Sequence, residues 1–114
     1  MSQVQQLVQT KGLQVIDVDL WDTSADVIAS YKAMNLKVIC YFSAGSYENW
    51  RPDASTFPKA YLLAPLDGWP NESWLKLTGF DANAVTSPLA PIMSKRIKMA
   101  QAKGCHAIDV CFFF

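Results

Sequence analysis

The sequence predicts an α/β fold with parallel strands, and its alternation of segments supports this class. Apolar, strand-like segments occur at residues 15–20, 37–42 and 105–110, and the first two are rich in β-branched and aromatic side chains. Segments with helical spacing of apolar residues lie between them, at about 24–35 and 88–103. A strand, a helix and a strand within about thirty residues form a βαβ unit, so we expect a right-handed crossover and parallel strands.

The first predicted strand carries two carboxylates. A weakly amphipathic helix over residues 2–11 ends at Gly12 and leads into this strand, where Asp17 and Asp19 share one face. Carboxylates in a strand otherwise suited to burial are costly unless they reach a cavity or a partner. Asp19 lies near the end of the strand, where parallel sheets open to substrate, so we favour Asp19 for function. A structural hydrogen-bonding role for Asp19 is the alternative.

The stretch KVICYFSAGSYENWRPD, residues 37–53, contains the strongest site signal. Its apolar strand ends at small residues that let the backbone turn and approach a ligand closely. Polar and aromatic groups suited to binding follow at once. The strand and loop therefore favour a site at the C-terminal end of the sheet, although an ordinary polar loop has the same composition.

Residues 52–70 are punctuated by proline and poorly periodic, which predicts a long lid or binding loop. Trp50, Trp69 and Trp74 lie in or beside it, and exposed indole faces stack on the apolar faces of sugar rings or on bases. Arg51 and Asp53 are suited to hydrogen bonding with hydroxyl groups. The alternative is that the tryptophans pack the loop onto the body. A short strand is expected near residues 74–77.

The last predicted helix begins near Pro88 and Pro91 and runs to about Lys103, with Gly104 as its cap. Its expected inner face consists of Leu89, Ile92, Met93, Ile97 and Ala100, and its expected solvated face of Lys95, Arg96, Lys98 and Lys103. We interpret the basic face as a wet surface and not as a nucleic-acid site. Asp109 then holds the same place near the end of the third strand that Asp19 holds on the first.

The amino-acid composition argues against several classes of binding partner. Ten basic residues balance ten acidic ones, which argues against binding to nucleic acid or an anionic membrane, and no apolar run is long enough to span a bilayer. No secretory signal follows Met1, so the protein is cytosolic or its true N-terminus is missing. Cysteine and histidine spacing predicts neither a metal site nor a cofactor. We expect Cys40 and Cys105 to be buried free thiols, with a bridge between them as the alternative in a secreted protein.

Several motifs together resemble glycoside hydrolase family 114. They are DLWDTS, VICYFSAGSYENWRPD, FP, PLDGWPNESWL and PIMSKRIKMAQAKGC, and the resemblance covers residues 15–109. It implies part of a (β/α)8 TIM barrel, with three to four parallel strands here, because family members are more than twice as long and often secreted. It also implies metal-free hydrolysis of α-linked galactosamine- or galactose-containing polysaccharides, of endo-α-1,4-polygalactosaminidase or α-galactosidase type. By position, Asp19, Tyr41, Ser43, Arg51, Asp53 and Trp69 would line the substrate cleft, with Asp109 beside the catalytic place.

The end of the chain departs from the family pattern GCDGVEPDN. Aligned on Gly104 and Cys105, Asp109 takes the place of the family's glutamate and Cys111 that of its catalytic aspartate. The second catalytic glutamate of the family lies on a later strand. Because a thiol differs from a carboxylate in acidity and position, the resemblance implies a chain that does not turn over. Residues 110–114 fit a translated intron, since codons for Val-Cys-Phe can contain the donor sequence GTATGT, as in fungal genes.

The resemblance therefore predicts one incomplete barrel domain over residues 1–114. Open sheet edges and an uncovered interior predict marginal stability, or self-association through those edges. A non-catalytic fragment that binds amino-sugar polymers, or that has no function, is the alternative to a hydrolase fragment. A small flavodoxin-like domain that binds a phosphorylated ligand is disfavoured, because no glycine-rich phosphate loop follows a strand.

Overall fold

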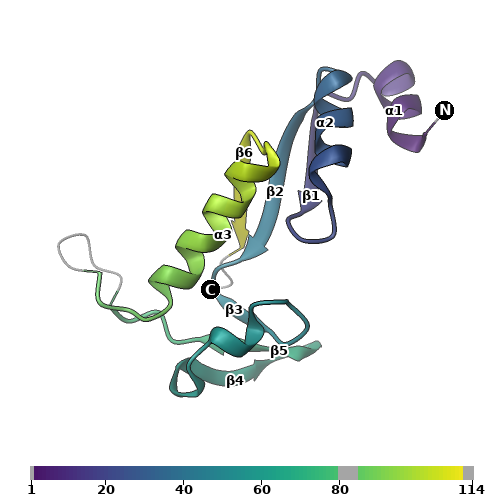
Figure 1. Cartoon of the computed structure of the whole chain (residues 1–114). Helices are drawn as coiled ribbons and strands as arrows, with labels where there is room; N and C mark the ends of the chain where they lie inside the picture. The colour runs from purple at the N-terminus through teal and green to yellow at the C-terminus, as the bar shows by residue number, and fades with distance from the viewer. Residues whose placement is uncertain (1, 80–84, 112–114) are drawn as a thin grey trace. The chain divides into compact units, whose positions relative to one another are not determined.

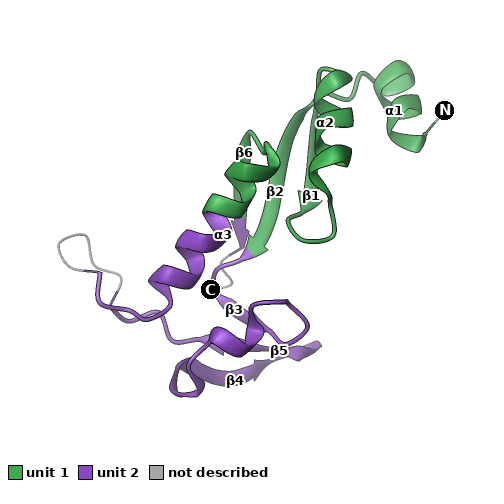
Figure 2. Ribbon diagram, viewed as in Figure 1, with its two compact units in different colours: residues 1–42, 98–109 green, residues 43–97, 110–114 purple. Residues whose placement is uncertain are grey.

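The computed structural model describes residues 2–79 and 85–111. In chain order it contains α1 (Gln3–Lys11), β1 (Val15–Asp19), α2 (Ala25–Ala33), β2 (Lys37–Ser43), β3 (Ser46–Glu48), the short 3-10 helices η1 (Ala54–Thr56) and η2 (Lys59–Tyr61), β4 (Leu62–Leu66), β5 (Trp69–Leu75), α3 (Ala90–Lys103) and β6 (Ala107–Cys111) (Figure 1). The chain divides into two compact units (Figure 2). Unit 1 comprises residues 1–42 and 98–109, and unit 2 comprises residues 43–97 and 110–114.

Unit 1 is built on the sheet β1-β2-β6. Strands β1 and β2 are parallel, with a register from Val15 opposite Lys37 to Asp19 opposite Tyr41. The connecting helix α2 begins at Ser24, whose hydroxyl accepts a hydrogen bond from the Val27 backbone N–H at 3.2 Å. It ends before Asn35, whose φ of 62° is the left-handed conformation that stops a helix. The predicted βαβ unit is therefore present.

The core of unit 1 consists of buried apolar side chains. The buried ones are Leu20, Ile28, Leu36, Val38, Cys40, Phe42 and Ala100. Alternate residues of β2 point to this side, which is why Val38, Cys40 and Phe42 are buried while their neighbours are less so.

The expectation of free thiols at Cys40 and Cys105 is wrong, because the two residues form a disulfide. Their Cα atoms lie 6.0 Å apart, within the range that a disulfide requires. The chain folds β2 against the segment before β6, and this brings together two cysteines 65 residues apart in sequence. Cys111 takes no part in this disulfide.

Unit 2 contains an antiparallel sheet in the order β3-β5-β4. The predicted lid over residues 52–70 is therefore wrong in large part, because this segment includes η1, η2, β4 and the start of β5. Proline misled the prediction: Pro65 is tolerated because β4 is an edge strand, and Pro70 precedes the stretch of β5 that pairs with β3. The strand expected near residues 74–77 is the end of β5.

The inner face of helix α3 agrees with the predicted one at most positions, including Met93 and Ala100, and differs at two. Leu89 and Ile92 are buried, and with Phe57 and Leu75 they form the hydrophobic cluster of unit 2. Arg96, expected in solvent, is 1% exposed, whereas Ile97, expected inside, is 47% exposed. The helix therefore buries a charged residue at a position where its spacing from Ile92 would suit an apolar one. Among the described residues no helix is long and apolar enough to cross a membrane.

Candidate functional site

The predicted site residues fall into both units. Asp19, Tyr41 and Asp109 belong to unit 1, and Ser43, Arg51, Asp53 and Trp69 belong to unit 2.

A pair of carboxyl groups from two strands meets on the sheet of unit 1. The side chain of Asp17 on β1 hydrogen-bonds with that of Asp109 on β6, although β2 separates the two strands. Desolvation, the hydrogen bond that the protonated Asp17 carboxyl group donates to Asp109 and the charge of Asp109 together raise the pKa of Asp17 to about 6. Strongly shifted pKa values of carboxyl groups cluster at functional sites, which makes Asp17 a candidate site residue. We favoured Asp19 over Asp17, so the sequence interpretation missed this partner of Asp109.

Asp19 shapes the turn that follows β1. Its Oδ1 accepts hydrogen bonds from the backbone N–H groups of Trp21 at 2.9 Å and Asp22 at 3.0 Å. An Asp that binds its own downstream backbone in this way forms an Asx turn. The structural role left open for Asp19 is thus present, and its place opposite Tyr41 keeps both residues at the C-terminal end of paired strands.

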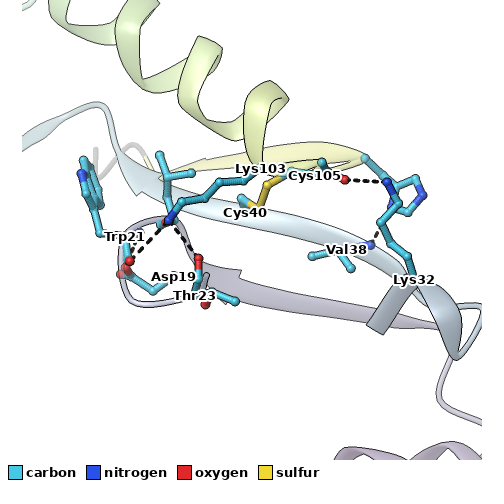
Figure 3. The surroundings of a disulfide bond; sticks show 11 residues. Asp19, Trp21, Thr23, Lys32, Val38, Cys40, Lys103 and Cys105 are labelled. Atoms are coloured by element: carbon cyan, nitrogen blue, oxygen red, sulfur yellow. Dashed lines mark hydrogen bonds between the residues drawn. A yellow bond between two sulfur atoms is a disulfide. The ribbon is translucent and has the colours of Figure 1, made fainter. Parts of the chain in front are cut away.

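Lys103, at the end of α3, fastens the same turn. Its Nζ donates hydrogen bonds to the carbonyl oxygens of Leu20 at 2.6 Å, Thr23 at 2.9 Å and Trp21 at 3.4 Å. Figure 3 shows this ammonium group above the turn, with the Cys40–Cys105 disulfide beside it. Lys103 was expected in solvent, so its role as a clamp on backbone carbonyls corrects that expectation.

In unit 2, the buried Arg96 joins two of the predicted site residues. Its Nε and Nη2 donate to the two carboxylate oxygens of Asp53, each at 2.8 Å, and its Nη1 donates to the Ser43 carbonyl oxygen at 2.8 Å. Its guanidinium also lies 5.2 Å from the centroid of the Phe57 ring. Asp53, predicted to bind hydroxyl groups, therefore has both oxygens engaged by a guanidinium within the protein.

Arg51 is also buried within a polar cluster, at 6% exposure. Its Nε and Nη2 donate to the two carboxylate oxygens of Glu48, each at 3.2 Å. Desolvation outweighs the attraction of Arg51 and raises the pKa of Glu48. Next to it, Ser46 donates to Glu72 at 2.8 Å, and the Ser43 and Ser46 hydroxyl groups are 2.6 Å apart. The backbone of β3 and β5 holds Glu48 opposite Glu72.

A hollow in unit 2 is bordered by one of these buried charged residues, Glu72. Its cavity volume is about 150 Å³, and it is lined by Trp50, Trp69, Pro70, Asn71 and Glu72. Trp50 and Trp69 are 53% and 56% exposed, which is high for large aromatic side chains. The Arg51 guanidinium lies 5.5 Å from the centroid of the Trp50 ring and so supports this indole. Of the predicted site residues of unit 2, Trp69 is the one that presents an exposed aromatic surface.

Arg96 and Glu72 had been overlooked as candidates, and the sequence held a signal for only one of them. Ile92 lies three residues after Leu89, and Arg96 lies four residues after Ile92. This helical spacing places Arg96 on the inner face of α3. Glu72 lies in a segment interpreted as a loop, where no spacing marks it. Among residues 2–79 and 85–111, no group of three or more His, Cys, Asp or Glu residues is arranged to hold a metal ion.

Comparisons with known proteins identify the class. A family model described as glycoside-hydrolase family GH114 matches residues 2–110. The chain therefore belongs to glycoside-hydrolase family GH114, as its motifs indicated. A search of curated proteins found no match.

Two solved structures resemble the chain. The crystal structure of Aspergillus fumigatus Ega3 in complex with galactosamine is 40% identical over 87% of this chain, with a TM-score of 0.78. The glycoside hydrolase domain of PelA from Pseudomonas aeruginosa, in its variant E218A, covers 93% of this chain at 13% identity with a TM-score of 0.67, a likeness in fold alone. The chain spans 37% of the Ega3 chain and 40% of the PelA chain.

Proposed function

We propose that this chain forms one part of a hydrolase that acts on polysaccharides containing α-linked galactosamine or galactose. The expected type is an endo-α-1,4-polygalactosaminidase, with an α-galactosidase as the less favoured specificity. The observation that carries the proposal is the 40% identity, over 87% of this chain, to a protein crystallised with galactosamine. The strands described here correspond, in this proposal, to the first strands of a partial TIM barrel.

We further propose that the chain alone does not hydrolyse the polymer. Glycosidases place two carboxyl groups about 5 to 9.5 Å apart, one as acid and one as nucleophile or base. The side chains of Asp17 and Asp109 are hydrogen-bonded to each other, so they lie closer together than the carboxyl groups of either arrangement. Cys111, at the place of the family's catalytic aspartate, has a sulfur side chain and no carboxylate.

One experiment tests both the proposed substrate class and the proposed lack of hydrolysis. The purified chain is incubated with an α-1,4-linked galactosamine oligomer, and products are followed by mass spectrometry while retention is followed on a column that carries the same oligomer. Retention without shorter products is the expected result. Product formation that disappears in Asp109→Asn would overturn the proposed inactivity, and the absence of both retention and products would count against the substrate class.

Non-catalytic binding of carbohydrate is the second candidate function. The exposure of Trp50 and Trp69 at one small hollow favours it, because indole faces stack on sugar rings. Self-association through sheet edges stays a prediction: within the described residues β1 and β6 are the outer strands of their sheet, and light scattering of the purified chain between micromolar and millimolar concentration measures it.

A further inference from the structure

The hollow between Trp50 and Trp69 combines exposed aromatic surface with buried negative charge. Its volume of about 150 Å³ is below the ~300 Å³ at which pockets begin to enclose drug-sized ligands, so it suits one small ring. Because the two indoles remain more than half exposed, they lack much of the stabilisation that large aromatic side chains gain when their apolar surface is buried. Such surfaces on a folded protein are typical of places where a ligand supplies the missing contact.

The polar groups behind the hollow favour a cation. Glu72 lines it, and the buried carboxylate of Glu48 and the partly exposed carboxylate of Asp53 belong to the same cluster of ion pairs. Against these three carboxylates the cluster contains two guanidiniums, those of Arg51 and Arg96, so with every group ionised one negative charge is in excess. Both guanidiniums are already engaged, Arg51 by Glu48 and Arg96 by Asp53.

Glu72 is the carboxylate best placed to meet a ligand. It is the charged residue among those that line the hollow, and Ser46 donates to its Oε2 at 2.8 Å. This hydrogen bond fixes the side chain, and a carboxylate has several acceptor positions beyond a single hydroxyl donor. A ligand with a protonated amine would add a charge-assisted hydrogen bond in a poorly solvated place, where such bonds are strong.

We propose that the hollow formed by Trp50, Trp69 and Glu72 binds one hexosamine ring with a free, protonated amine. The apolar face of the ring stacks on an indole, and the ammonium group donates to the Glu72 carboxylate. This inference rests on the proposed function for its choice of sugar. It adds that residues of unit 2 recognise the charged amine.

The test measures binding of galactosamine, N-acetylgalactosamine and galactose to the whole chain by NMR chemical-shift titration. Trp50→Ala and Trp69→Ala should each weaken galactosamine binding at least about tenfold. Glu72→Gln should remove the preference for galactosamine over N-acetylgalactosamine and galactose, because the amide no longer attracts an ammonium group. Trp21→Phe lies outside the hollow and serves as the control, with unchanged affinity expected.

The outcomes separate the two proposals. Galactosamine binding that survives both tryptophan variants, or shifts confined to unit 1, would overturn this inference and leave the proposed function standing. Equal affinity of the wild-type chain for galactosamine and N-acetylgalactosamine would also overturn it, because charge would then play no part. Binding of none of the three sugars overturns it as well, whereas the proposed substrate class is judged on the longer oligomer. Circular dichroism of each variant verifies that the fold is retained.

Discussion

Arg96 and Asp53 form a two-pronged ion pair, in which each carboxylate oxygen accepts one hydrogen bond at 2.8 Å. The arginine comes from α3 and the aspartate from the residue before η1, so the pair joins segments 43 positions apart. The third bond of the guanidinium goes to the Ser43 carbonyl oxygen at the end of β2. One buried side chain therefore fixes the point at which the chain leaves β2 and the segment that leads into η1.

We expect Arg96→Met to destabilise the protein by about 3 kcal/mol, because it leaves a partly buried carboxylate and a backbone carbonyl without their donor. The free energy of unfolding is measured by urea titration with circular dichroism. Lys95→Ala, an exposed neighbour on the same helix, is the control and should stay within about 0.5 kcal/mol of the wild type. Equal stability of Arg96→Met and the wild type would show that the buried arginine contributes nothing net.

The Cys40–Cys105 disulfide should contribute about 4 kcal/mol to the free energy of unfolding, since it closes a loop with a sequence separation of 65 residues. The double variant Cys40→Ser/Cys105→Ser tests this by thermal unfolding with and without dithiothreitol. Reductant should lower the melting temperature of the wild type and leave that of the double variant unchanged. A wild-type melting temperature that does not respond to complete reduction would contradict the prediction.

The Asp17–Asp109 pair should make stability fall as the pH rises from about 4 to about 6.5. The pKa of Asp17 is raised from 3.8 to about 6 in the folded protein, so the folded state holds a proton that the unfolded state releases in this window. Its stabilising contribution is complete below pH 3.8 and is lost as the pH passes through 6. Because Asp17 is exposed, we expect at most about 1 kcal/mol.

Asp17→Asn should remove this pH dependence, and Asp109→Asn should lower the pKa of Asp17 toward 3.8, as followed by carbon-13 NMR of the carboxyl groups. Asp26→Asn, in the first turn of α2, is the matched control and should preserve the dependence. An Asp17 titration that is the same with and without Asp109 would refute the pairing.

Lys103→Met should loosen the turn after β1 without unfolding the sheet. The variant removes the donor to the carbonyl oxygens of Leu20 and Thr23, and we expect a loss of about 1 to 2 kcal/mol. Hydrogen exchange of the amides between residues 20 and 24 should accelerate, while amides in β2 change little. Lys98→Met, exposed on the same helix, is the comparison. Uniform acceleration across unit 1 would show a global effect and not a local clamp.

The parallel part of the fold followed from the sequence because its signals are local. Apolar segments rich in β-branched or aromatic residues marked β1 and β2, and Ser24 with Asn35 marked the two ends of α2 within two residues. The antiparallel sheet of unit 2 was missed because its pairing is non-local. The register of Ser46 opposite Trp74 depends on strands 28 positions apart, and no single segment reveals it.

The site was predictable to a lesser degree. Asp109 and Trp69 were found from their places in motifs and Trp50 from its aromatic ring, but the pairing of Asp17 with Asp109 depends on which strands meet. Arg51 and Asp53 were chosen for their chemistry as ligands, and the structure places both in internal ion pairs. The residue type alone does not tell whether an arginine or an aspartate faces solvent or pairs with another side chain. The difference depends on packing, which spacing indicates only on a regular helix such as α3.

The disulfide has a topological effect as well as an energetic one. Because it joins Cys40 to Cys105, nearly all of unit 2 lies inside a covalent ring. A protease that cleaves one peptide bond in that ring opens it but releases no piece, so the nicked protein would migrate as one species in a non-reducing gel. The two fragments would separate only after reduction of the disulfide. The covalent ring therefore keeps the protein in one piece after a single proteolytic cleavage.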